Sequence, residues 1–213
     1  MHIYRYTPIC YSNDINKGAD KKMSNAIDYS NWKEEKIDGK VYYMSPSANP
    51  KHSEVIFKLS MAFGNYLKGK SCKVFTDNID IYLDEEQNNY VIPDLSILCD
   101  VSKFKDNGYH GVPSLIVEVI SPTSYKRDRY LKHALYEKYG VSEFWLVDYQ
   151  GKTLEQYVLC NGKYQLYNAI AMISEWDYNH RLTAAERAEY TTIINPTIFK
   201  DLEIDIKEIF VGI

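Results

Sequence analysis

The chain has 213 residues, of which 45% are hydrophobic and 25% are charged, and its formal net charge at pH 7 is −4. This length and hydrophobic content are enough for one domain with a substantial core. The slightly negative balance excludes a generic polyanion-binding protein, so any contact with nucleic acid must come from a local basic face.

No segment of the sequence is long and apolar enough for a transmembrane helix, and the N-terminus lacks the apolar run of a signal peptide. We therefore expect a cytoplasmic protein without a membrane contact. The cysteines form no C-x-x-C pair and have no histidine at zinc-site spacing. A disulfide framework is not needed in a chain of this length, so reduced thiols are expected at Cys10, Cys72, Cys99 and Cys160.

The N-terminal residues 1–29 are polar and lack hydrophobic periodicity, which predicts a poorly ordered extension. Order is expected to begin near Trp32, so the folded domain covers residues 30–213. Asp38-Gly39 is a turn pair that precedes a strand. Asn49-Pro50 places a capping residue before a proline, and it begins an amphipathic helix over residues 50–68.

The rest of the domain alternates short apolar runs with a single further helix. That helix is predicted over residues 125–139, where Gly140 supplies the left-handed residue that ends it. Asn161-Gly162 is typical of a hairpin turn. Strands are expected at 41–44, 72–75, 79–83, 91–99, 114–120, 144–147, 154–159 and 164–167, with a short closing element at 204–210. This order predicts a mixed α/β sheet with few helices.

Two of the predicted strands each carry one carboxylate within an apolar run. Asp94 follows Pro93 in the first strand, and Glu118 is enclosed by β-branched residues in the second. A carboxylate is expensive to bury unless something pairs with it, so a shared cation is predicted. Two alternatives stay open: Asp94 could bond to backbone amides, and Glu118 could form a buried ion pair with Lys132 alone.

The helix after Glu118 carries Asp128, Lys132 and Tyr136 at i, i+4 and i+8, which places them in one stripe. A neighbouring face with Leu131, Ala134 and Leu135 is expected to dock on the sheet, so the Lys132 stripe should border the buried surface. Asp128 and Lys132 could also form an ordinary i, i+4 salt bridge that contributes about 0.3–0.5 kcal/mol.

These landmarks together resemble the Uma2 family, a branch of the PD-(D/E)XK nuclease superfamily. The resemblance runs from about Trp32 to the C-terminus, and it implies a restriction-endonuclease-like α/β fold, with a mixed β-sheet flanked by helices. The segments that carry it are Glu35–Gly39, Pro50–His52, Pro93-Asp94, Glu118–Pro122, Asp128, Lys132, Tyr136, Gly140-Val141 and Glu143–Asp148.

The resemblance implies that Asp94 and Glu118 bind Mg²⁺ or Mn²⁺ through their carboxylate oxygens. The superfamily pattern expects a lysine two positions after the second acid, where this chain has Ile120. Lys132 on the following helix is the expected replacement. Glu35 is the candidate third acid, and Glu54 is a weaker rival for that role.

The resulting hypothesis is a magnesium-dependent endonuclease that hydrolyses phosphodiester bonds, with DNA as the expected substrate. A homodimer is consistent with cutting two strands. Lys126, Arg127, Arg129 and Tyr136 are candidates for contacts with nucleic acid, although the basic residues could form a solvated face and Tyr136 could pack in the core. His52 is expected to be a capping or surface residue. The alternative hypothesis is a nuclease-fold module with weak or no activity that binds nucleic acid or a protein partner.

Overall fold

The structure is a computed structural model, and it describes residues 32–44 and 49–213. The predicted N-terminal extension lies outside the described residues. Among the described residues, no helix is long and apolar enough to cross a membrane.

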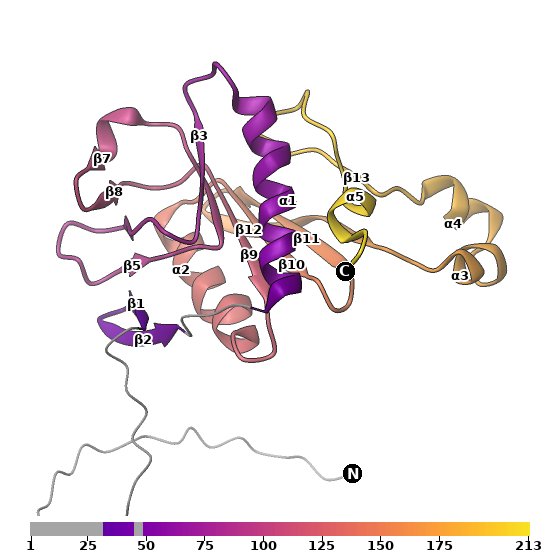
Figure 1. The fold of residues 1–213 in the computed structure, drawn as a ribbon, viewed down its shortest axis with the longest axis horizontal. Coiled ribbons are helices and arrows are strands. Elements are labelled where there is room, and N and C mark those ends of the chain that lie inside the picture. The colour runs from indigo at the N-terminus through magenta and orange to yellow at the C-terminus, as the bar shows by residue number, and fades with distance from the viewer. Residues whose placement is uncertain (1–31, 45–48) are drawn as a thin grey trace, which may run out of the picture. The chain divides into compact units, whose positions relative to one another are not determined.

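The larger sheet has six strands in the order β12-β11-β10-β9-β6-β3 (Figure 1). β9 and β10 pair in parallel, whereas all other neighbours in this sheet pair antiparallel. The predicted mixed sheet is therefore confirmed. Its strands are β3 (Lys73–Thr76), β6 (Leu95–Leu98), β9 (Leu115–Ile120), β10 (Glu143–Asp148), β11 (Thr153–Cys160) and β12 (Lys163–Ala171).

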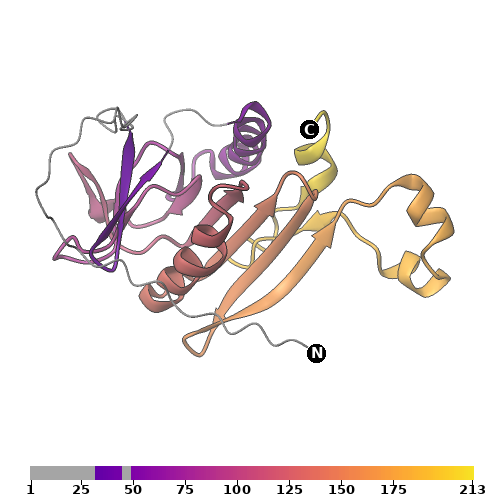
Figure 2. The same ribbon diagram turned by 90° about the horizontal axis from the view of Figure 1, so that it is seen from below.

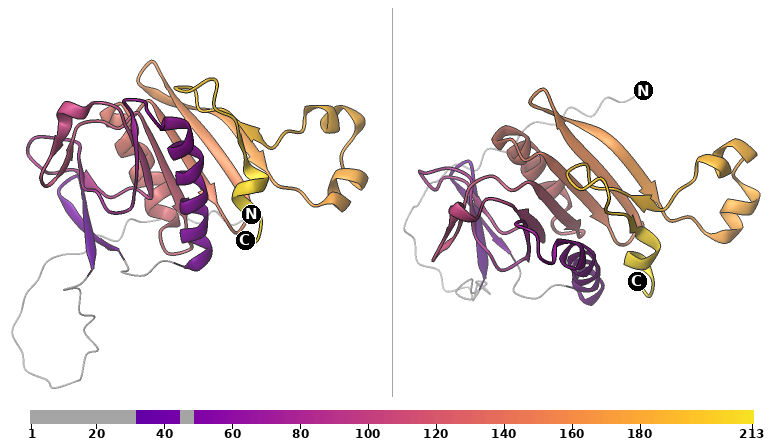
Figure 3. Two further views of the ribbon diagram at one scale, coloured as in Figure 1. Left: turned by 45° about the horizontal axis from the view of Figure 1, so that its top comes forward. Right: turned by 90° about the horizontal axis from the view of Figure 1, so that it is seen from above.

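One face of this sheet is covered by α1 (Pro50–Leu67), together with the short α5 (Ile206–Phe210) (Figure 3). The α1 residues Val55, Leu59 and Phe63 are fully buried and recur at i, i+4 and i+8, as the periodicity predicts. Phe63 packs on Trp145 of β10, with their ring centroids 5.6 Å apart. This packing holds α1 against the sheet.

The opposite face of the sheet is covered by a helix that begins with a π-helical segment and continues as an α-helix (Figure 2). Arg127–Lys132 form a π-helix, η2, which continues as the α-helix α2 (His133–Tyr139). Gly140 ends it with a left-handed φ of 83°, as predicted. This helix connects the parallel strands β9 and β10, as a parallel crossover requires.

The predicted orientation of that helix is correct for Leu135 and wrong for its other side chains. Leu135 is buried as predicted, but Leu131 is 37% exposed and Ala134 is also exposed, and the stripe of Asp128, Lys132 and Tyr136 is buried instead of bordering the buried surface. The prediction assumed 3.6 residues per turn, and the π-helical turn changes the angular position of each side chain. The polar stripe can face inward because its members bond to one another and to buried carboxylates on the strands.

The smaller sheet also has six strands, in the order β2-β1-β5-β4-β8-β7, and it packs beside η2 and α2. Asp38 and Gly39 connect the first hairpin with positive φ values of 47° and 76°, which confirms the predicted turn. The strands are β1 (Lys33–Ile37), β2 (Lys40–Met44), β4 (Ile81–Tyr82), β5 (Tyr90–Val91), β7 (Phe104–Lys105) and β8 (Gly108–His110), with the short helix η1 (Val101–Lys103) before β7.

The strand predicted over residues 91–99 is divided between the two sheets. β5 belongs to the smaller sheet and β6 to the larger one, with residues 92–94 between them. Pro93 has no backbone N–H to contribute to a ladder, so the chain changes sheets at this position. Asp94 consequently lies immediately before β6 and not inside a strand.

The C-terminal part returns to the larger sheet through the two-stranded pair β13 (Ile193–Ile194) and β14 (Ile204–Asp205). Before this pair, α3 (Glu175–His180) and α4 (Ala184–Glu189) project away from both sheets (Figure 1). Neither of these two helices has a buried side chain. The periodicity of the sequence did not indicate either of them.

Cys72 and Cys99 form a disulfide, so the expectation of reduced thiols is wrong for these two residues. β3 and β6 pair antiparallel with Lys73 opposite Leu98, and one further step of this register places the two cysteines opposite each other. Opposed residues in antiparallel strands are close enough for a disulfide. Cys160 has no disulfide partner among the described residues, and Cys10 lies outside them.

Candidate active site

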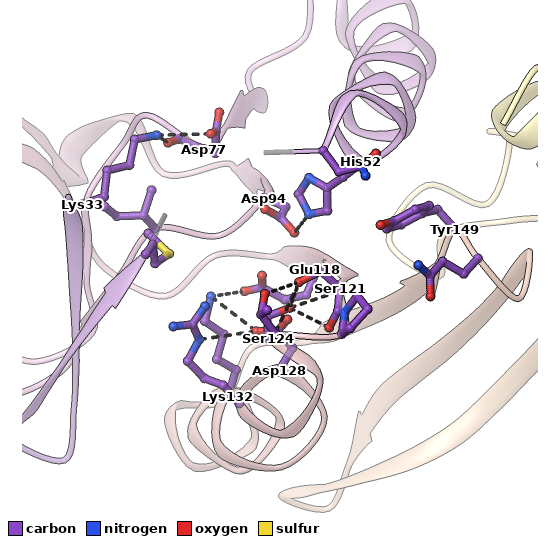
Figure 4. A pocket seen from close by; sticks show the side chains of 17 residues that line it. Lys33, His52, Asp77, Asp94, Glu118, Ser121, Ser124, Asp128, Lys132 and Tyr149 are labelled. Atoms are coloured by element: carbon purple, nitrogen blue, oxygen red, sulfur yellow. Dashed lines mark hydrogen bonds and ion pairs between the residues drawn. The ribbon is translucent and has the colours of Figure 1, made fainter. Parts of the chain in front are cut away.

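A cleft of about 480 Å³ opens where the first turn of α1 meets the ends of β9 and β10 (Figure 4). Its walls come from elements far apart in the sequence, and most of its side chains are polar. The residues that line it are Lys33, Met44, Asn49, His52, Asp77, Ile92, Asp94, Glu118, Ser121, Pro122, Thr123, Ser124, Arg127, Asp128, Lys132, Tyr149 and Gln150.

Asp94 and Glu118 reach this cleft through the pairing of β6 with β9. Leu95 lies opposite Val117 in the antiparallel register, and one further step places Asp94 opposite Glu118. Opposed residues of antiparallel strands project toward the same side of the sheet. The two acids that the sequence analysis singled out therefore line one cleft.

The Asp94 carboxylate makes two contacts through the same oxygen. Its Oδ2 accepts a hydrogen bond from the Val119 N–H at 2.7 Å, and His52 Nε2 lies 3.3 Å from this atom. The alternative that Asp94 bonds to backbone amides is therefore confirmed for one of its carboxylate oxygens, Oδ2. The expectation that His52 is a capping or surface residue is wrong, because its side chain is 12% exposed and faces Asp94. Burial lowers the pKa of His52, but Asp94 raises it above its ordinary value.

Glu118 and Lys132 form an ion pair in the protein interior. Lys132 Nζ lies 3.0 Å from Glu118 Oε1, and both side chains are 2% exposed. The Tyr136 hydroxyl donates to the same oxygen at 2.6 Å. Lys132 and Tyr136 are one helical turn apart, so both reach Glu118 from the same side.

Glu35 on β1 holds the Lys132 amine from the other side. Its Oε1 lies 2.7 Å from Lys132 Nζ and accepts a hydrogen bond from the Ile92 N–H at 2.9 Å. Glu35 is completely buried, and its Oε2 has no hydrogen-bond partner among the described residues. Its rival, Glu54, is not brought to the cleft: it is exposed and pairs with Lys58 at 2.8 Å.

Asp128 is a buried member of this cluster and not half of a surface ion pair. Its Oδ1 lies 4.0 Å from Lys132 Nζ, and both side chains are at most 3% exposed. Burial raises the pKa of Asp128, although Lys132 and a hydrogen bond from Ser124 act in the opposite direction. The predicted i, i+4 pair is therefore present, but it lies in the interior because the helix presents this stripe to the core.

Negative charge exceeds positive charge around Glu118. Burial raises the pKa of Glu118 well above its usual value; Lys132 opposes this rise, and the carboxylates of Asp94, Asp128 and Glu35 add to it. Burial lowers the pKa of Lys132, but the facing carboxylates outweigh burial and raise it. Lys132 is therefore held in its charged form, within a cluster that can accept further positive charge.

The four residues proposed to contact nucleic acid have different surroundings. Arg127 lines the cleft, with its Nε 3.8 Å from both Glu35 Oε2 and Asp128 Oδ1. Lys126 is exposed. Arg129 forms two hydrogen bonds to Glu155, at 2.8 and 3.0 Å.

Tyr136 is fully buried, so the expectation that it contacts a phosphate is wrong. Its ring packs against Phe144 of β10, with the centroids 5.5 Å apart. The Tyr136 hydroxyl instead donates a hydrogen bond to Glu118 within the protein interior.

The donor set fits a hard divalent cation. Two carboxylates line one cleft, and the neighbouring acids leave an excess of negative charge there. Among the described residues, no three His, Cys, Asp or Glu side chains form a ready-made metal cage. Mg²⁺ does not require one, because it commonly keeps several waters and uses only one or two carboxylates.

Several residues of the cleft were not singled out as site residues by the sequence analysis. Ser121, Thr123 and Ser124 lie in the loop between β9 and η2, where their hydroxyl groups bond to one another. Tyr149 packs edge-on against His52. Loop residues such as these carry no periodicity, so only the folded arrangement reveals them. His52 did carry a signal, because it lies three residues before Val55 on the sheet-facing stripe of α1.

Two curated proteins of Synechocystis sp. are similar in sequence to this chain. "Uncharacterized protein slr1290" is 34% identical over 115 residues, which cover 51% of this chain and 60% of the relative. "Uncharacterized protein sll1609" is 27% identical over 128 residues, which cover 59% of this chain and 71% of the relative. The chain therefore spans less than two thirds of the first of these relatives.

A solved structure from Anabaena variabilis, described as "a putative nuclease belonging to DUF820", superimposes with a TM-score of 0.61. The two chains are 16% identical, and the match covers 84% of this chain and 89% of the other. At this identity the likeness concerns the fold, which is restriction-endonuclease-like. The model of the Uma2 family, described as "Putative restriction endonuclease", matches residues 22–180. The chain belongs to the Uma2 family.

Proposed function

We propose that this protein is a divalent-metal-dependent endonuclease that hydrolyses phosphodiester bonds in DNA. The observation that carries the proposal is the meeting of Asp94 and Glu118 in one cleft, with Lys132 Nζ 3.0 Å from Glu118 Oε1. The family description and the nuclease-like fold support the same reaction class.

In this proposal Asp94 and Glu118 hold Mg²⁺ or Mn²⁺ through carboxylate oxygens. A bound ion of this kind supplies an activated water and neutralises charge that develops on the scissile phosphate. The excess negative charge around Glu118 supports binding of a cation at this position. Two nearby carboxylates repel each other in a buried site, and an ion between them removes this repulsion.

Lys132 orients the phosphate and offsets its charge in the transition state. The amine can do this only if its position is fixed, and Glu35 and Glu118 fix it from two sides at 2.7 and 3.0 Å. Glu35 therefore acts through Lys132. The buried surroundings strengthen each electrostatic interaction, because water does not screen it.

Arg127 is the residue we assign to a phosphate of the substrate. It lines the cleft beside the acidic cluster, and its side chain is 21% exposed. The guanidinium group matches the geometry of a phosphate and keeps its charge at all physiological pH values. A duplex has two strands to cut, so a homodimer would place one such cleft at each strand.

The test is a supercoiled-plasmid nicking assay in Mn²⁺ with native protein, Asp94→Ala, Glu118→Ala and Lys132→Ala. The proposal predicts nicking by the native protein and loss of it in all three variants. Glu54→Ala is the matched control, since this exposed acid lies away from the cleft. Equal nicking by every preparation would identify a contaminating nuclease and contradict the proposal.

A second candidate function is a nuclease-fold module that binds nucleic acid or a protein partner without cleaving. The observation that favours it is the engagement of Lys132, whose amine is already shared between two buried carboxylates. Under this alternative, Lys132 only neutralises the interior. Native protein that binds DNA but neither binds Mn²⁺ nor nicks plasmid would establish it.

A further inference from the structure

His52 is a side chain of the cleft that the proposed mechanism leaves without a role. It lies in the first turn of α1, just after the N-cap Asn49, whose side chain accepts a hydrogen bond from the Lys51 N–H at 2.9 Å. Side chains of a helix lean back toward its N-terminus, and for His52 this direction leads into the cleft. Val55, three residues later, packs on the sheet and holds this face of α1 inward.

Two elements hold the Asp94 carboxylate through the same oxygen. His52 Nε2 of α1 lies 3.3 Å from Oδ2, and the Val119 N–H of β9 donates to the same atom at 2.7 Å. Tyr149 packs edge-on against the imidazole, with the ring planes at 88°. Figure 4 shows the imidazole beside the carboxylate, with Tyr149 on its far side. The ring is therefore held in place and the carboxylate cannot rotate freely.

The chemistry of the contact defines the state of the ring. The carboxylate oxygen is an acceptor, so His52 Nε2 is the donor in this contact. Nδ1 is buried and has no hydrogen-bond partner among the described residues. Both contacts of Asp94 within the described part of the chain use Oδ2. Oδ1 is thus the oxygen left for a cation.

We propose that His52 is a positioning residue that holds Asp94 Oδ2, so that Oδ1 faces the divalent ion. This inference rests on the proposed function, since it needs Asp94 to be a metal ligand. Groups that hydrogen-bond to a metal ligand typically change metal affinity by about 10–100-fold when they are removed. His52 therefore strengthens metal binding without touching the ion.

A direct ligand would behave differently. A histidine that binds a metal needs a nitrogen without a proton aimed at the ion. Glutamine at position 52 can supply an N–H close to the place of Nε2, but it has no imidazole lone pair. The His52→Gln variant therefore distinguishes between two roles of His52, as a hydrogen-bond donor to Asp94 or as a direct ligand of the metal.

The experiment is calorimetric titration of the full chain with Mn²⁺, for native protein, His52→Ala and His52→Gln. We expect affinity to fall by about 10–100-fold in His52→Ala and to return to within about threefold of native in His52→Gln. His110→Ala is the control, because His110 stacks on Tyr82 in the smaller sheet and is not among the cleft residues. Its affinity should equal that of native protein.

Nicking as a function of Mn²⁺ concentration gives a second readout. His52→Ala should need more Mn²⁺ for half-maximal nicking and should approach the native rate at saturation. If His52→Ala bound Mn²⁺ with native affinity, this result would overturn the inference about His52 but not the proposed function. An equal loss in His52→Gln would overturn it as well, because a donor would then not suffice. No Mn²⁺ binding by native protein would overturn the proposed function together with this inference.

Discussion

Lys132 Nζ and Glu118 Oε1 lie 3.0 Å apart in the interior, although 14 residues separate them in the chain. The partners come from a strand and from the helix that follows it, so the β9–η2 connection determines their distance. Each charge is buried because the other is present. Stability and the proposed activity therefore depend on the same pair.

Replacing Lys132 by methionine should strongly destabilise the fold. The change leaves Glu118 and Glu35 in the interior without their cation, and breaking a buried ion pair by removing one partner costs about 3–5 kcal/mol. The free energy of unfolding in urea measures this loss. Combining Lys132→Met with Glu118→Gln should recover part of it, because one uncompensated charge disappears. A loss below about 1 kcal/mol would contradict the buried cluster.

Tyr136→Phe tests the hydroxyl that donates to Glu118. The substitution keeps the packing of the ring but removes a hydrogen bond to a buried charged group, which costs about 1–3 kcal/mol. Urea unfolding should show this decrease at unchanged m-value. Tyr125→Phe is a suitable control, since Tyr125 is 45% exposed. Equal stability of both variants would mean that the Tyr136 hydroxyl does not support Glu118.

Glu155 should contribute a pH-dependent part of the stability. Burial raises the pKa of Glu155, but the hydrogen bonds from Arg129 and Tyr157 outweigh burial and hold the pKa below its ordinary value of 4.5. Folding therefore favours the ionised form. The stabilisation is fully present above the unfolded pKa and is lost as the pH falls through the folded pKa.

Unfolding free energies of native protein and Glu155→Gln between pH 3 and pH 7 check this prediction. The native protein should be the more stable of the two at pH 7, and the difference should shrink as the pH falls below about 4.5. Glu85→Gln, a change in an exposed loop, should follow the native curve. A constant difference at all pH values would contradict the lowered pKa of Glu155.

The Cys72–Cys99 disulfide should stabilise the folded chain when it is formed. It closes a loop with a sequence separation of 27, and loops of this size are stabilised by about 2–4 kcal/mol. Reduction should therefore lower the urea midpoint of native protein. The urea midpoint of the Cys72→Ser variant should not change on reduction. Complete alkylation of unreduced, unfolded protein would show that this bond does not form.

Arg127→Ala should weaken binding to duplex DNA, measured in Ca²⁺ so that the substrate stays intact. Loss of one phosphate contact should also reduce the slope of log K against log salt by about 1. Lys126→Ala is the natural comparison, because it removes the same charge from an exposed neighbour. Arg129 is bound to Glu155, so its loss should affect stability more than DNA affinity. Equal effects of Arg127→Ala and Lys126→Ala would exclude a specific role for Arg127.

The fold was predictable wherever a local pattern determines local structure. The stripe of Val55, Leu59 and Phe63 predicts α1, and Gly140 predicts the end of α2. The separation of residues 91–99 between two sheets was not predictable from apolar content, because both strands are buried. The Cys72–Cys99 bond depends on the β3–β6 register, which the sequence does not display.

The site was predictable in its acids and its lysine, because a carboxylate in an apolar strand has few explanations. Glu35, the candidate third acid, lies in the same cluster, 2.7 Å from Lys132 Nζ. The inward face of η2 was missed because an α-helical wheel cannot represent a π turn. His52 was missed because a helix start is a common place for a polar residue, and its partner is 42 positions away.

The most direct measurement is anomalous diffraction from crystals of the protein soaked in Mn²⁺. The account predicts one strong peak in the cleft, within about 2–2.5 Å of a carboxylate oxygen of Asp94 and one of Glu118. The peak should disappear in Asp94→Ala crystals treated in the same way. A native cleft without a peak, in crystals that leave it open to solvent, would contradict the proposed metal site.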